Sequence, residues 1–227
     1  MCSVQPQKND DEVEIKNQLG VAFHFACPIY LAERPDFLKD VSTVSDEYLK
    51  KAQEDRSGED ELITLMTEGY HNDERLRNFT EFVGVTAWDI LKEQGYEMAG
   101  RETTFMAMWT QEHNRHSLME QHVHGEGAQI VGFYFLETPD ECSRLVVHDP
   151  RAGKLQIDMP EQDPIEASVA SRMINFEPKP GLIVFTNAWL AHSFSRHMAS
   201  KPLKFVHFNL SVQNAAPTSF VSAAEVI

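Results

Sequence analysis

The chain has 227 residues, of which 42% are hydrophobic and 24% charged, so it can bury one large core and is neither disordered nor fibrous. Its 35 acidic residues outnumber the 20 lysines and arginines, which gives a formal net charge of −15. That charge repels phosphates and argues against a nucleic-acid or anionic-membrane partner.

The N-terminal segment and the cysteines both favour a soluble, cytoplasmic protein. Residues 1–18 are polar and charge-rich, lack the apolar run of a secretory signal, and are expected to form a mobile terminus. No stretch approaches the roughly 18 apolar residues that span a bilayer. Cys2, Cys27 and Cys142 are odd in number and far apart, so neither a disulfide framework nor a thiolate zinc site is expected.

The hydrophobic period changes along the chain. Residues 21–33 carry apolar side chains on both faces and predict a buried strand. Apolar residues at helical spacing predict two amphipathic helices, over 36–55 and 73–94, joined by an acidic segment and an apolar patch of ambiguous structure. From residue 103 onward eight short segments read as strands: TTFMAMWT, QIVGFYFL, RLVVHD, KLQID, RMINFE, GLIVFT, HSFSR and LKFVHFNLSV.

These elements predict a mostly β protein with helical support. Eight short strands suit a jelly roll, whose open mouth is a common place for a ligand. No linker rich in Gly, Ser or Pro separates the helices from the strands. We therefore expect one domain over residues 19–227, with helical support from 34–100 and a jelly-roll core from 101–214.

The segment QHVHGEG, residues 121–127, carries metal-binding side chains at alternate positions. On a strand, residues i and i+2 share a face, so either His122 with His124 or His124 with Glu126 points one way. His192, in FTNAWLAHSF, follows a β run and a tight turn, and is the expected third ligand. Three ligands on one face leave positions open for substrate, oxygen or a cosubstrate, as in non-haem iron oxygenases.

Both ligand sets stay open on the residues alone. A pair of histidines two residues apart is a weak motif, because a solvated strand edge also produces it. Glu126 lies between two glycines, as loop residues often do, yet a carboxylate partly offsets the charge of Fe(II) and suits that ion.

Several segments together resemble 2-oxoglutarate and Fe(II)-dependent oxygenases of the kind found in marine bacteria and cyanophages. The resemblance runs from about residue 21 to 212 and rests on a W-x12-H-x-H spacing, VGFYFLETP, VVHDPR, PGLIVFTNAWLAHSF and FVHFNLSV. It implies a double-stranded β-helix, a cupin-like jelly roll. It also implies Fe(II) and 2-oxoglutarate as cofactors, and hydroxylation of an unknown small-molecule or peptidyl substrate coupled to decarboxylation of 2-oxoglutarate to succinate. The fold often pairs through helices or edge strands, so a homodimer is a candidate assembly.

The family pattern favours His122, His124 and His192 as metal ligands, but the chain departs from it elsewhere. Gly125 stands where the family has proline, and Leu203 falls where its last strand has arginine. Lys204 is the next residue, and it can replace that arginine as the anchor of the 2-oxoglutarate carboxylate only if a bulge or a different register turns it inward.

Other residues are also candidates for binding the cosubstrate. Arg196 and Arg151 are alternative anchors for the carboxylate, and Tyr134 is a candidate hydrogen-bond donor to the cosubstrate. The missing arginine also suits a second hypothesis, a cupin-like three-histidine dioxygenase that does not use 2-oxoglutarate. A third hypothesis is a non-catalytic jelly-roll binding module.

Overall fold

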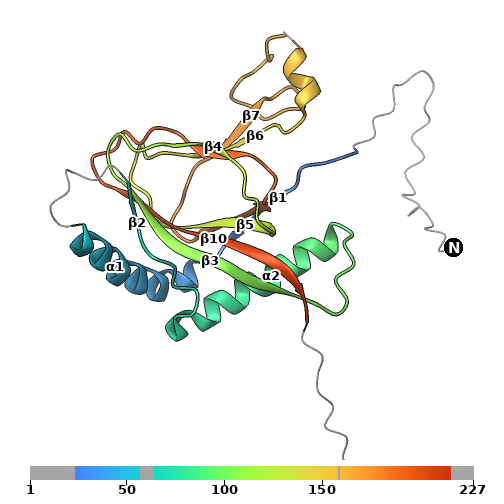
Figure 1. The fold of residues 1–227 in the computed structure, drawn as a ribbon. Coiled ribbons are helices and arrows are strands. Elements are labelled where there is room, and N and C mark those ends of the chain that lie inside the picture. Colours follow the sequence, from blue (N-terminus) through green and yellow to red (C-terminus); the bar gives the residue numbers. More distant parts are fainter. Residues whose placement is uncertain (1–23, 57–63, 158, 216–227) are drawn as a thin grey trace, which may run out of the picture.

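The computed structural model describes residues 24–56, 64–157 and 159–215, so the predicted mobile terminus lies outside the described residues. Two helices and two antiparallel sheets make up the described part of the chain (Figure 1). The helices are α1 (Leu38–Asp55) and α2 (Arg77–Glu93), close to the two predicted ranges, and a 3-10 turn precedes each, η1 (Pro35–Phe37) and η2 (Glu74–Leu76). No helix in this part of the chain is both long and apolar enough to cross a bilayer.

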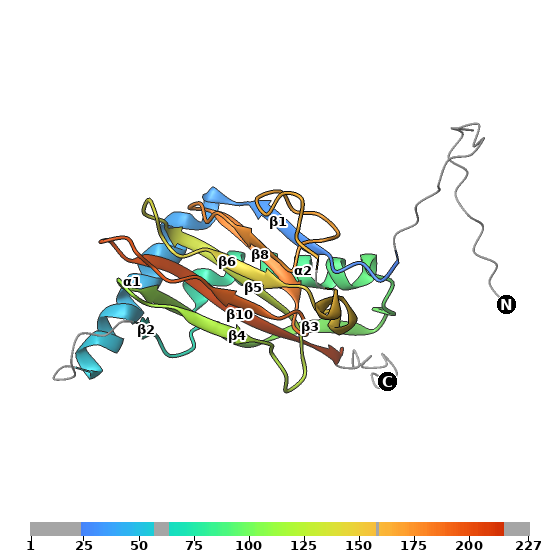
Figure 2. The same ribbon diagram turned by 90° about the horizontal axis from the view of Figure 1, so that it is seen from above.

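The larger sheet has six strands in the order β1-β8-β5-β10-β3-β2, and the smaller has four in the order β4-β9-β6-β7. The two sheets lie face to face, and both helices cover the outer face of the larger one (Figures 1 and 2). This is the predicted jelly roll with helical support. The strands are β1 (Ile29–Glu33), β2 (Thr64–Met66), β3 (Arg101–His113), β4 (Met119–His122), β5 (Ala128–Glu137), β6 (Leu145–His148), β7 (Met173–Phe176), β8 (Leu182–Asn187), β9 (His192–Phe194) and β10 (Leu203–Asn214).

Three sequence predictions need correction. The strand expected over 21–33 is limited to β1 in the described residues, and it is a partly exposed edge strand rather than a buried one. The segment KLQID was predicted as a strand, but Ala152–Gln156 forms the 3-10 helix η3. Strand β4 ends at His122, so His124 lies in the following loop. In each case the local residue pattern did not show which strand the backbone would pair with.

The core has two layers, which follow from strand alternation. Tyr134 on β5 and Val206 and Phe208 on β10 point outward and pack beneath the helices. Phe133 and Phe205 on the same two strands point inward and fill the space between the sheets. The inner layer combines four phenylalanines with five aliphatic residues and consists of Phe133, Phe135, Leu145, Val147, Val184, Leu190, Phe194, Leu203 and Phe205.

Gly132 in β5 lies where the sheet has no room for a side chain. A Cβ atom there would be 2.3 Å from the Phe208 ring and 2.6 Å from the carbonyl oxygen of Val184. Both distances are well inside van der Waals contact, and one partner is backbone that cannot rotate away. The glycine therefore allows Phe208 of β10 to pack across β5.

We predict that Gly132→Ala lowers the free energy of unfolding by about 3 kcal/mol, because overpacking of this kind forces the backbone or the ring to move. Gly153→Ala is the matched control, since a Cβ there would meet nothing within 4 Å. Urea denaturation of both variants tests this, and equal midpoints for the two would contradict the packing argument.

Candidate metal centre

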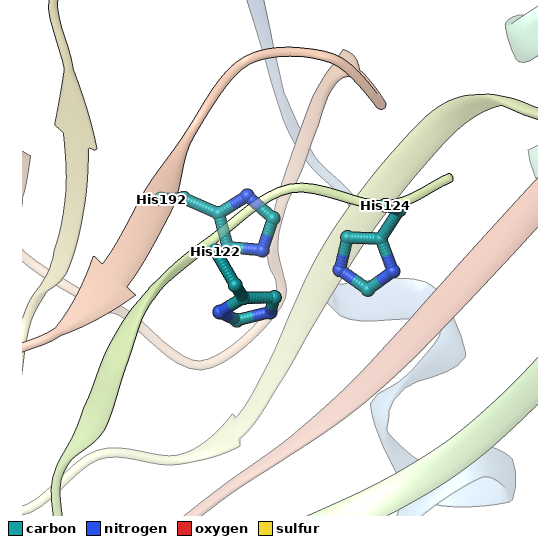
Figure 3. Close-up of side chains that lie close together, drawn as sticks. All are labelled: His122, His124 and His192. Carbon is teal, nitrogen blue, oxygen red and sulfur yellow. The ribbon is translucent and has the colours of Figure 1, made fainter.

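Three imidazoles gather between the smaller sheet and the loop that follows β4 (Figure 3). His122, at the end of β4, is paired directly with His192, at the start of β9. His124 is held two residues further on, where its backbone N–H donates to the carbonyl of Ala188 at 2.9 Å. One ring nitrogen of each histidine lies within 4.8 Å of those of the other two. Because metal–nitrogen bonds of about 2.1 Å hold ligand atoms roughly 3 to 4 Å apart, a small inward movement lets all three bind one ion.

Hydrogen bonds fix which ring nitrogen two of these histidines present. His122 Nδ1 lies 2.8 Å from the carbonyl oxygen of Glu120, and His192 Nδ1 lies 3.2 Å from that of Leu190. A carbonyl only accepts, so both Nδ1 atoms carry the hydrogen and both Nε2 atoms keep a lone pair. His192 Nε2 is buried, and within the described residues it has no hydrogen-bond partner. An orphaned buried acceptor of this kind is what a metal ligand looks like without its ion.

The electrostatics also suit a cation. Burial lowers the pKa of His192 to about 3, and the neighbouring His122 acts in the same direction. Burial, followed by His122, lowers the pKa of His124 to about 4. Both rings are therefore neutral at neutral pH, which is the form that binds metal.

The competing ligand set is not assembled. Glu126 is exposed, has a φ of 57° and lies at the tip of the loop, outside the group of donors that converge. The turn between Gly125 and Ala128, whose ends are joined by a 3.1 Å hydrogen bond, carries Glu126 away from a strand conformation. The alternation expected for an extended strand therefore does not apply after His122.

Lys204 does not point into the jelly roll. Its ammonium group forms ion pairs with Asp46 of α1 at 2.9 Å and with Glu137 of β5 at 3.0 Å. A register shift does occur beside Lys204, but the extra residue belongs to β5, so β10 keeps its alternation. Leu203 and Phe205 on either side face inward, and the lysine faces the helices. Neither a bulge nor a different register of β10 turns Lys204 inward, so the condition set for its role is not met in this structure.

The other expected cosubstrate contacts are also placed elsewhere. The Tyr134 hydroxyl donates to the carbonyl of Arg34 at 2.7 Å on the helix side, away from the three histidines. Arg151 is paired with Asp149 at 2.7 Å and lines a cavity of about 550 Å³ that none of the three clustered histidines borders. Arg196 is exposed beyond β9. Within the described residues no lysine or arginine is buried, so the inner layer holds no cation for a carboxylate.

A fourth histidine, His207 of β10, was not singled out as a site residue from the sequence. It is 1% exposed, and its Nε2 lies 3.3 Å from His124 Nε2. Its Nδ1 lies 3.1 Å from the carbonyl oxygen of Gly132 and so carries the hydrogen, which leaves Nε2 as an acceptor beside His124. Burial lowers its pKa well below the usual value. In the sequence, His207 lies two residues after Phe205 and therefore shares its face of the strand. Which face of β10 points inward is known only from the structure.

Comparisons with known proteins agree with this geometry. Residues 107–209 match the family model described as "Putative 2OG-Fe(II) oxygenase", and this segment contains all four histidines. No curated protein matches the sequence. The matched segment, which is less than half of the chain, is thus similar to 2OG-Fe(II) oxygenases.

Solved structures share the fold at low sequence identity. AviO1 from Streptomyces viridochromogenes Tue57 is 9% identical with a TM-score of 0.59, over 84% of this chain and 92% of that one. A Pseudomonas putida prolyl-4-hydroxylase is 9% identical with a TM-score of 0.52, over 82% and 93%. The viral collagen prolyl hydroxylase of Paramecium Bursaria Chlorella virus-1, solved with 2OG, is 10% identical with a TM-score of 0.52, over 80% and 94%. These matches establish the fold, and they do not indicate which substrate this chain uses.

We predict that His192→Ala and His122→Ala each abolish retention of stoichiometric iron, because each removes one of three converging donors. Glu126→Ala should retain iron fully, since that carboxylate is outside the cluster. Iron is measured after purification without a metal-affinity tag, with circular dichroism to check folding. Loss of iron in the Glu126 variant together with retention in the His122 variant would restore the competing ligand set.

We also predict that His207→Phe weakens metal binding by about 10- to 100-fold while the protein stays folded, because groups that contact a metal ligand tune its affinity by that amount. The change keeps a ring of similar size and removes the nitrogen beside His124. Competition with a chelator gives the affinity. An unchanged affinity would mean that His207 acts in packing alone.

Proposed function

We propose that His122, His124 and His192 hold Fe(II), and that the protein uses 2-oxoglutarate and oxygen to hydroxylate a C–H bond of a small molecule or peptide. When bound, the ion would activate oxygen, which is the oxidant. Oxidation of 2-oxoglutarate to succinate and carbon dioxide would take up one oxygen atom and leave the other for the C–H bond. The observation that carries the proposal is the cross-strand cluster of three imidazoles, in which His192 Nε2 has no hydrogen-bond partner within the described residues.

The charge of the ligand set supports an anionic cosubstrate. Three neutral imidazoles leave the full double positive charge of the ion uncompensated, whereas a set with Glu126 would neutralise half of it. A 2-oxo acid that is a dianion at neutral pH complements such a centre. The family model that matches residues 107–209 is described by that cosubstrate.

The surrounding side chains keep water from one side of the ion. The ring of Phe133 stands 5.2 Å from that of His192 and 4.5 Å from that of His207, measured between centroids. Behind it, the Phe194 and Phe205 rings stack at 4.6 Å. This aromatic layer excludes solvent and holds His192 in place, so the open positions of the ion must face away from it.

The remaining parts of the proposal rest on the sequence. The PGLIVFTNAWLAHS segment supports a relation to the oxygenases of marine bacteria and cyanophages, and the scattered cysteines support a cytoplasmic location. The net charge of −15 disfavours a polyanionic substrate. A homodimer formed through the helices or an edge strand is the assembly that we propose, and sedimentation tests it.

We predict that the Fe(II) protein develops a weak visible charge-transfer band when 2-oxoglutarate is added without oxygen. Anaerobic absorption spectroscopy of protein with measured iron content gives the result. Iron without a band would favour a three-histidine dioxygenase that binds its substrate directly. The observation that favours this alternative is Leu203, which stands where the family has the arginine that binds 2-oxoglutarate. Absence of stoichiometric iron would indicate a binding module instead.

A further inference from the structure

A cavity of about 360 Å³ opens beside the candidate metal centre, and His124 lies in its wall. It is bounded by the end of α2 and the loop before β3, by the start of β5, and by the turn between β8 and β9 that leads to His192. Its lining is mostly apolar or aromatic, with Leu91, Tyr96, Met98, Trp189 and Val212 among its residues. A cavity of this size and character holds a small organic molecule.

Two side-chain hydrogen bonds fix one side of the cavity. Gln94, which caps α2, and Asn187, at the end of β8, exchange two amide hydrogen bonds of 3.0 Å each. Asn187 is 4% exposed, so this pair of hydrogen bonds joins the helix to the sheet where little water has access. The wall that carries Trp189 is therefore fixed relative to the helix before any ligand arrives.

Arg101 is the one cationic residue in this lining. Its backbone is held on both sides, because its N–H donates to Met98 O at 3.2 Å and its carbonyl accepts from Trp88 Nε1 at 3.0 Å. Its guanidinium, in contrast, has no ion-pair or hydrogen-bond partner in the described part of the chain. Glu97 also lines the cavity, but its carboxylate accepts from the backbone N–H of Ala99 at 2.9 Å.

Arg101 differs from the basic residues elsewhere in the fold in being available to bind an anion. Arg151 lines the larger cavity, but two of its nitrogens are bound to the Asp149 carboxylate at 2.7 and 2.8 Å. Lys204 is likewise satisfied by Asp46 and Glu137. Arg101 thus combines a free planar guanidinium with a place in the cavity that His124 borders. A guanidinium binds a carboxylate through two parallel hydrogen bonds.

We propose that Arg101 is the carboxylate-binding residue of the reaction pocket, and that the cavity beside His124 receives a carboxylic acid with an apolar or aromatic body. This rests on the proposed function, because it treats the three-histidine cluster as the metal centre that the pocket serves. The carboxylate belongs either to the distal end of 2-oxoglutarate or to the substrate. In both cases the anchor lies outside the aromatic layer between the sheets, where Leu203 offers no charge.

The experiment compares wild type, Arg101→Gln and the control Arg115→Gln, which changes an exposed arginine that lines neither cavity. In the first arm, 2-oxoglutarate is titrated into anaerobic Fe(II) protein and the visible band gives its Kd. In the second, saturation-transfer NMR on Zn(II)-loaded protein measures binding of 3-phenylpropionate and of the uncharged 3-phenylpropan-1-ol.

We expect Arg101→Gln to weaken the binding of one of the two acids by at least about tenfold, the factor for losing one charge-assisted hydrogen bond. Binding of the alcohol should be unchanged. Weaker 2-oxoglutarate binding assigns the anchor to the cosubstrate, and weaker 3-phenylpropionate binding alone assigns it to the substrate. Arg101→Lys should recover part of the loss, and Arg115→Gln should behave as wild type.

Unchanged binding of both acids in Arg101→Gln would overturn the proposal, as would failure of both acids to bind the wild-type protein. These results are separable from failure of the proposed function. If the wild type retains iron and shows the band while Arg101→Gln loses nothing, the oxygenase assignment stands and only the anchor is wrong. If the wild type shows no band, the NMR arm still tests Arg101, because it uses no iron signal.

Discussion

The pairing of β4 with β9 is the constraint on which the site depends. Four residues of β4 and three of β9 form a short antiparallel ladder that sets His122 opposite His192, although the two are 70 positions apart in the chain. Directly opposed residues in such a ladder have Cβ atoms about 5 Å apart, so their rings meet without any special turn. The third imidazole is added by the hydrogen bond from His124 to Ala188, which ties the loop after β4 to the turn before β9. One local sheet contact therefore assembles most of a metal site.

Burial gives that site its chemical character. Imidazoles in a dry aromatic setting are neutral at neutral pH, so they offer lone pairs and bring no charge of their own. The ion they hold would keep its full charge and attract an anion. The space between the sheets cannot supply the opposite end of such an anion with a cation, because it is filled by phenylalanine rings and Leu203. The cavity beside His124 is partly open and carries Arg101, whose guanidinium has no partner among the described residues.

The outer layer supports this arrangement from a distance. Tyr134 and Lys204 both act between the larger sheet and the helical layer, one through a backbone carbonyl and the other through two carboxylates. They fix how the larger sheet sits beneath the helices, and the end of α2 then forms one wall of the reaction cavity. Residues that looked like cosubstrate contacts thus stabilise the scaffold, and a residue that was not considered, Arg101, lies in the cavity.

The sequence by itself predicted the fold class, both helices and the candidate ligands His124 and His192, because periodicity and the PGLIVFTNAWLAHS segment are local signals. It did not determine which side of β10 faces inward, that Glu126 leaves the strand, or that His207 and Arg101 approach His124. Those facts depend on register and on which strand contains the bulge, and a shift of one residue reverses every side chain on a strand. Only packing the two sheets and the helices together selects one register, so the ligand set and the charges around it were decided by the tertiary structure.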